Sequence, residues 1–146
     1  MMTKQDWEFQ IGHIEGWLAE HGYQLVQATD EEDQVELAAR VIRINSRQHP
    51  ETRFYTLLHE AGHVDIYENG AAEFAAEHPM YVQAEHGRSA TSKAFRVSLL
   101  AEELEAWRIG RRLARAEDLF IDDAKFDKLM TSCVMTYINW AADRHV

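Results

Sequence analysis

Residues 59–63 read His59-Glu60-Ala61-Gly62-His63, which is an H-E-x-x-H pattern. On a helix, residues four apart lie one turn apart on the same face, so both imidazoles can reach one metal ion. Imidazole nitrogen is a common ligand of Zn²⁺, and a carboxylate beside the pair can take a proton from the water that such a metal activates. The pattern therefore predicts that His59 and His63 bind zinc and that Glu60 is the catalytic base.

The pattern is short, so the residues around it decide how it is interpreted. Phe54, Leu57, Leu58 and Ile66 surround it at the spacing of a helix that faces a core. The alternative is a chance match, in which two histidines lie on the surface of an amphipathic helix. The apolar periodicity favours the metal site.

A catalytic zinc site needs a third protein ligand and an open position for water. The compact pattern with a third histidine fails, because Ile66 and Asn69 occupy its glycine and histidine positions. An acid-rich stretch further along the chain supplies the candidates. Glu103 lies on the apolar stripe of its expected helix, where an unpaired carboxylate would be costly. We therefore expect Glu103 to be the third ligand, with Glu102 as the alternative.

An oxyanion formed at a cleaved carbonyl needs a hydrogen-bond donor besides the metal. Tyr67 lies two turns after His59 and near the face of His63, so we predict it as this catalytic donor. Other candidates are Tyr55, His78, Tyr81 and His86. For each of these side chains, packing in the core or exposure at the surface is the simpler alternative.

Three segments of the chain resemble a known family. Ile42–Asn45, Arg53–His63 and Glu103–Trp107 resemble stretches of the ImmA/IrrE-type zinc metallopeptidases. Members of that family have an I-x-I-N strand end, an R-F-T-x-x-H-E-x-G-H helix and an E-x-E-A-N-type helix. The resemblance covers about residues 40–110, and Trp107 stands where the family usually has Asn.

The resemblance implies a minimal zincin-like fold, with His59 and His63 as ligands, Glu60 as the base and Glu103 as the third ligand. It also implies a zinc metalloendopeptidase that hydrolyses a peptide bond in a protein or peptide substrate, such as a regulator or repressor. The alternative is a catalytically quiet zincin-like module that binds a regulator, as an anti-repressor of a phage or mobile element would. The intact Glu60 favours the peptidase.

These motifs need helices to present them, and apolar spacing with the Gly and Pro positions predicts the elements. Helices are expected over residues 6–21, 51–67, 71–77, 92–116 and 122–142, with strands over 23–28 and 37–45. Residues 29–33 are expected to form a turn and residues 80–91 a loop, and a helix beginning at 36–39 is an alternative to the second strand. The inward face of the last helix is expected to hold Phe126, Leu129, Val134, Tyr137 and Ile138. The predicted class is α+β, mostly helical with a small N-terminal β-sheet.

Composition limits the classes of function. The chain has 146 residues and a net charge of −10, which predicts one globular domain over residues 1–146 and argues against direct nucleic-acid binding. No apolar run is long enough to span a membrane, and the first residues do not form a signal peptide, so we expect a cytoplasmic protein. The single cysteine, Cys133, excludes an internal disulfide and a zinc site built from cysteines. The oligomeric state is left open.

Overall fold

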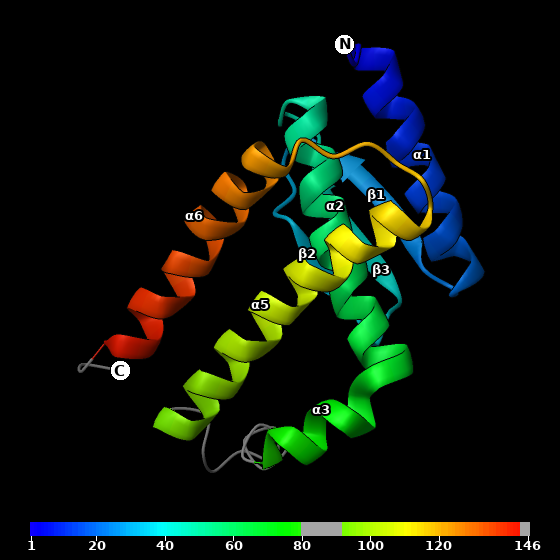
Figure 1. Cartoon of the computed structure of the whole chain (residues 1–146). Coiled ribbons are helices and arrows are strands. Elements are labelled where there is room, and N and C mark those ends of the chain that lie inside the picture. The colour runs from blue at the N-terminus through cyan, green and yellow to red at the C-terminus, as the bar shows by residue number, and fades with distance from the viewer. Residues whose placement is uncertain (80–91, 144–146) are drawn as a thin grey trace.

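The computed structural model describes residues 1–79 and 92–143, which form a three-stranded sheet and a set of helices (Figure 1). The elements are, in chain order, α1 (Lys4–Glu20), β1 (Gln24–Ala28), β2 (Gln34–Glu36), β3 (Val41–Asn45), α2 (Pro50–Asp65), the π-helix η1 (Ile66–Gly70), α3 (Ala71–Glu77), α5 (Lys93–Ala116) and α6 (Asp123–Ala142). This order confirms the predicted α+β class, mostly helical with a small N-terminal sheet. The loop predicted over residues 80–91, with Tyr81 and His86, lies outside the described residues.

The helices begin where the sequence offers capping groups. The Thr3 hydroxyl accepts a hydrogen bond from the Asp6 amide, and the Asp6 carboxylate accepts one from the Thr3 amide, which forms a capping box. Pro50 occupies the first turn of α2, and the side chains of Ser92 and Asp122 cap α5 and α6. The predicted helix starts therefore lie within two residues of those observed.

The sheet has β3 in its centre, with β1 parallel to it on one side and β2 antiparallel to it on the other. Strand β2 corrects the prediction of only two strands, the second beginning at Leu37; the alternative helix over 36–39 is not observed either. The chain turns between β2 and β3 and passes through Arg40, whose φ of 56° lies in the left-handed region and cannot continue a strand. A strand of three residues is too short to show the alternation of buried and exposed side chains that reveals strands in a sequence.

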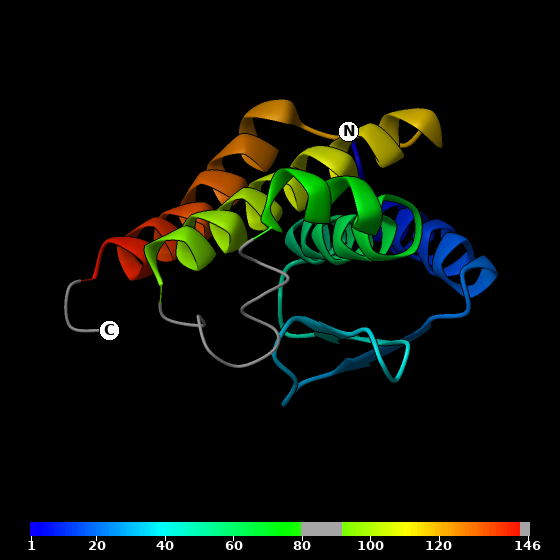
Figure 2. The ribbon, with the colours of Figure 1, turned by 90° about the horizontal axis from the view of Figure 1, so that it is seen from below.

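Helix α2 lies in the middle of the fold, between the sheet and α5, with α1 beside it (Figure 2). Ile42 and Ile44 of β3 are buried beneath it, and α2 itself buries Phe54, Leu58 and Val64. A helix that is buried on nearly every side is held by packing, and its polar side chains are held with it. The H-E-x-x-H motif is therefore on the most enclosed helix of the fold.

Helices α2 and α5 cross with their backbones almost in contact. A Cβ atom at Gly62 would overlap the carbonyl group of Ala106, and one at Gly110 would overlap the carbonyl group of Leu58. Only glycine fits at these two positions. Gly62, which the metal-site pattern leaves unspecified, therefore lets the helix that carries Glu103 approach the helix that carries the histidines.

Helix α6 packs along α5 and leaves one side open to solvent. Phe126 is fully buried, but Ile138, which was predicted to face inward, is 38% exposed. The buried guanidinium of Arg96 in α5 donates hydrogen bonds to the carbonyl groups of Ala141 and Asp143. These bonds fasten the end of α6 to the start of α5, so α6 is held at both of its ends.

Candidate metal centre

One face of α2 presents the two histidines of the motif. Their rings lie with centroids 4.7 Å apart, and the Nε2 atoms of His59 and His63 are 3.1 Å apart. His63 is buried and His59 is largely buried. Two imidazole nitrogens thus converge on one small volume, as the spacing of four residues predicts.

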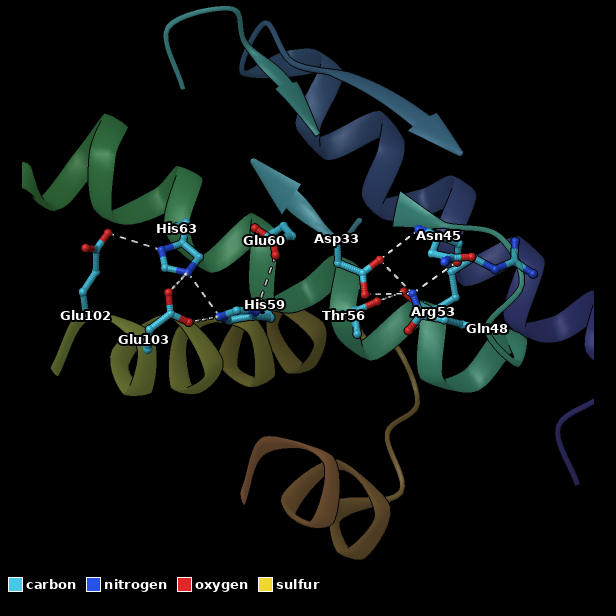
Figure 3. A network of polar contacts seen from close by, with 10 residues as sticks. All are labelled: Asp33, Asn45, Gln48, Arg53, Thr56, His59, Glu60, His63, Glu102 and Glu103. Atoms are coloured by element: carbon cyan, nitrogen blue, oxygen red, sulfur yellow. Dashed lines mark hydrogen bonds and ion pairs between the residues drawn. The ribbon is translucent and has the colours of Figure 1, made fainter. Parts of the chain in front are cut away.

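Helix α5 brings a carboxylate to the same volume. One oxygen of Glu103 lies 2.8 Å from His59 Nε2, and the other lies 3.1 Å from His63 Nε2 (Figure 3). Glu103 itself is buried. The structure therefore brings the predicted third residue to both predicted histidines.

Glu102, the alternative to Glu103, contacts the opposite nitrogen of the His63 ring. Its Oε1 atom lies 3.2 Å from His63 Nδ1 (Figure 3). A carboxylate at that nitrogen fixes the tautomer and the direction of an imidazole whose other nitrogen binds a metal. Glu102 and Glu103 thus contact different nitrogens of the same ring.

Glu60 lies beside the histidines and is buried, with 5% of its surface exposed. Its Oε1 atom is 3.5 Å from His59 Nδ1. Burial raises the pKa of Glu60, although the positive charge of either neighbouring histidine lowers it, and the negative charges of Glu103 and Asp33 raise it further. A carboxylate with a raised pKa is suited to accept and return a proton near neutral pH.

Without a metal, the centre is a network of paired charges. Burial lowers the pKa of His63, but its hydrogen bonds to Glu102 and Glu103 outweigh this and raise the pKa to about 10. Burial raises the pKa of Glu103, but hydrogen bonds with His59 and His63 outweigh this and lower the pKa to about 2. A metal that binds here therefore competes with a proton on His63.

His59, Glu60 and His63 form a group that could hold a metal ion, because their ligand atoms lie within 4.8 Å of one another. Of the two nearby carboxylates, Glu103 faces the Nε2 atoms of both histidines, whereas Glu60 approaches Nδ1 of His59. A metal between the Nε2 atoms would therefore meet Glu103. Glu60 would lie beside that metal without binding it, as expected for the residue that the sequence predicts as the base.

A cavity of about 500 Å³ opens beside this group. Its described walls come from α2, α5, α6 and the start of β2, and they include Tyr137, Cys133 and Trp107. Burial and the nearby charge of Glu103 raise the pKa of Tyr137. Cys133 is half-buried and packs against the hydrophobic core.

Tyr67, predicted as the oxyanion donor, does not line this cavity, and its side chain is 49% exposed. The physical reason is the change of helix type after Asp65. Residues 66–70 form a π-helix, which has wider turns than an α-helix, so Tyr67 does not follow His63 on the same face. Tyr55 is also absent from the cavity walls, because its hydroxyl bonds Glu51 and the Asp122 amide.

Two side chains at the site have no role in the sequence prediction. Tyr137 was expected to face inward, and Trp107 was expected to be an apolar residue of its helix at a position where the similar family usually has Asn. Tyr137 could have been identified from the sequence because it places a polar hydroxyl group among the apolar positions of the last helix.

No family model matches the chain, and no curated protein or solved structure matches it. The resemblance to ImmA/IrrE-type metallopeptidases therefore stays a prediction that rests on three short segments. Among the described residues, none of the helices combines the length and apolar character required to cross a bilayer.

Proposed function

We propose that this protein is a zinc-dependent peptidase that hydrolyses a peptide bond in a protein or peptide substrate. The observation that carries the proposal is the meeting of two imidazole nitrogens and one carboxylate, from His59, His63 and Glu103, at 2.8–3.1 Å. A second carboxylate, Glu60, is buried beside them. A regulator or repressor as the substrate is supported only by the family resemblance.

The donor set fits zinc. Two histidines and one glutamate are a common protein ligand set of catalytic zinc sites, and they leave a position open for water or substrate. Glu102 at Nδ1 of His63 supplies the outer carboxylate that such ligands usually have. Bound Zn²⁺ supplies a Lewis acid that polarises a carbonyl group and lowers the pKa of water.

The chain's own residues would then perform the proton transfers. A carboxylate oxygen of Glu60 takes a proton from the attacking water and later donates it to the nitrogen of the leaving amine. The buried position of Glu60 keeps its pKa raised, so the carboxylate can accept that proton and hold it until it passes to the leaving amine. One group therefore serves as base and then as acid.

Tyr137 is a candidate for the hydrogen-bond donor to the carbonyl oxygen in the same cavity. Tyr137 lines the cavity from α6, near enough to Glu103 for the charge of that carboxylate to raise its pKa. A hydrogen-bond donor near the carbonyl oxygen stabilises the negative charge that develops there. We therefore assign this donor role to Tyr137 in place of Tyr67.

Metal analysis and two substitutions test the proposal. The purified chain is expected to hold one zinc per molecule, and His59→Ala is expected to lose it, whereas His13→Ala, at an exposed histidine of α1, keeps it. Glu60→Gln is expected to keep zinc and lose peptide hydrolysis. Full biological activity in Glu60→Gln would contradict a peptidase and favour the alternative, a module that binds a regulator without cleaving it.

A further inference from the structure

The cavity beside the metal centre has an acidic end that the hydrolysis itself does not use. It is about 500 Å³ in volume, which leaves room for a substrate side chain beside the reacting groups. Asp33, at the start of β2, lines it on the other side of Glu60 from His63 (Figure 3). This end is therefore available to recognise a substrate.

Asp33 is the one carboxylate of the described cavity wall that has no histidine nitrogen beside it. The described residues that line the cavity include four carboxylates and no Lys or Arg. Glu102 and Glu103 contact three histidine nitrogens at 2.8–3.2 Å, and Glu60 lies 3.5 Å from the fourth. In the described part of the chain, Asp33 has no ion pair.

Asp33 is nevertheless held firmly. Its Oδ1 accepts hydrogen bonds from the Asn45 amide at 2.8 Å and from Gln48 Nε2 at 2.7 Å, and Oδ2 also accepts from Gln48 at 2.8 Å (Figure 3). These donors are neutral, so the carboxylate is positioned while its negative charge is not cancelled. Asp33 is exposed to solvent and lines the same cavity as Glu60 of α2 and Cys133 of α6, so its charge lies at the open end of that cavity.

The neighbouring hydroxyl groups also offer lone pairs to a ligand. Thr56 Oγ1 donates to the Arg53 carbonyl at 3.1 Å, and Thr136 Oγ1 donates to the Cys133 carbonyl at 2.6 Å. A hydroxyl whose hydrogen is already bound can only accept from a third group. The cavity wall thus presents acceptors, which match an ammonium or guanidinium group that has several N–H donors and no acceptor.

We propose that the Asp33 end of the cavity is a subsite for the cationic side chain, Lys or Arg, of a residue next to the bond that is cut. This subsite rests on the proposed peptidase function, but its recognition of a cation can be measured without cleavage. A salt bridge to a positioned carboxylate would favour Lys over the uncharged norleucine by about 10- to 100-fold.

The test uses one mixture of synthetic peptides with randomised sequences and the full chain loaded with zinc. In the first arm, mass spectrometry identifies the bonds that the wild type cuts. In the second arm, the mixture passes over immobilised Glu60→Gln protein, and the retained peptides are sequenced. We expect Lys or Arg at one fixed position from the cut, and enrichment of the same residues among the retained peptides.

Three variants separate charge from loop structure. Asp33→Asn is expected to lower the preference for Lys over norleucine about tenfold or more. Glu32→Gln removes a neighbouring exposed charge and is expected to keep the preference. Gln48→Leu removes the main tether of Asp33 and is expected to lower the preference less than Asp33→Asn does.

Each outcome decides between the two proposals. An equal preference in Asp33→Asn and the wild type, an absence of any cationic preference, or an equal loss in Glu32→Gln would overturn the subsite and leave the peptidase standing. Retention of cationic peptides that depends on Asp33, with no bond cut by the wild type, would support the subsite and overturn the peptidase.

Discussion

The indole ring of Trp107 lies parallel to the imidazole ring of His59, with centroids 4.3 Å apart and planes 8° apart. Trp107 is 1% exposed, and the ring of Phe126 meets it edge-on at 5.5 Å. The plane of His59 is therefore fixed by a packed aromatic pair. Stacking occupies neither nitrogen of the imidazole, so Nε2 stays free to bind a metal beside Glu103.

Replacing Trp107 should therefore weaken metal binding. Outer groups that orient a ligand typically contribute 10- to 100-fold to metal affinity, and we expect a loss of about this size in Trp107→Leu. Trp107→Phe keeps a flat ring and should lose less. Competition with a chelator measures the affinity, and circular dichroism checks the fold. Trp140→Leu, at a partly exposed position of α6, is the control. A folded Trp107→Leu chain with unchanged affinity would refute the orienting role.

Gly62→Ala should destabilise the protein although alanine is the better helix former. The added Cβ would overlap the Ala106 carbonyl group, and overpacking of this kind costs about 1–3 kcal/mol. Gly16→Ala in α1 is the matched control: its Cβ would meet open space, so we expect a gain of up to about 1 kcal/mol. Urea unfolding measures both. A more stable Gly62→Ala chain would show that α2 and α5 do not cross this closely.

Tyr23 connects the start of the sheet to the π-helix, because its hydroxyl donates a hydrogen bond to Glu68 at 3.0 Å. Tyr23→Phe should lower the free energy of unfolding by about 1 kcal/mol at neutral pH. Burial and the bond to Glu68 raise the pKa of Tyr23 from 10.0 to about 12, so the folded state holds this proton more tightly than the unfolded state.

The contribution of Tyr23 is therefore complete below pH 10 and is lost as the pH rises from about 10 to about 12. Urea unfolding of the wild type and of Tyr23→Phe is measured across this pH range. The difference between their free energies of unfolding should become smaller as the pH rises. Tyr67→Phe, at an exposed side chain, is the control and should stay close to the wild type, because Tyr67 is only the smallest of the causes that shift the pKa of Tyr23. A difference that stays constant with pH would contradict the role of this proton.

The parts of the centre that depend on local spacing could be predicted from the sequence. His59 and His63 follow from helical periodicity, and Glu103 follows from the cost of a carboxylate on an apolar stripe. The helix starts follow from capping residues such as Ser92 and Asp122. In each case the signal that predicts the residue lies within a few positions of it in the sequence.

The parts that depend on distant contacts could not be predicted. Asp33 reaches the cavity because its carboxylate bonds residues at the end of β3, and Tyr137 reaches it because α6 packs against α5. The π-helix that displaces Tyr67 leaves no clear mark in the sequence, since residues 66–70 continue the apolar and polar pattern of α2. Tyr67 and Tyr137 were both predicted to lie on helices. Only the packing of those helices decides which of the two side chains reaches the cavity.

These two tyrosines give opposite expectations for catalysis. Tyr137→Phe removes a donor from the cavity, and loss of one oxyanion donor typically lowers kcat about 10²- to 10³-fold. Tyr67→Phe alters an exposed side chain outside the cavity, so kcat should stay close to the wild-type value. The zinc content of both variants should be unchanged, because neither hydroxyl is needed as a ligand. The two variants are compared by the steady-state hydrolysis of one peptide by zinc-loaded protein. A large loss of kcat in Tyr67→Phe, with no loss in Tyr137→Phe, would show that Tyr67 is the donor.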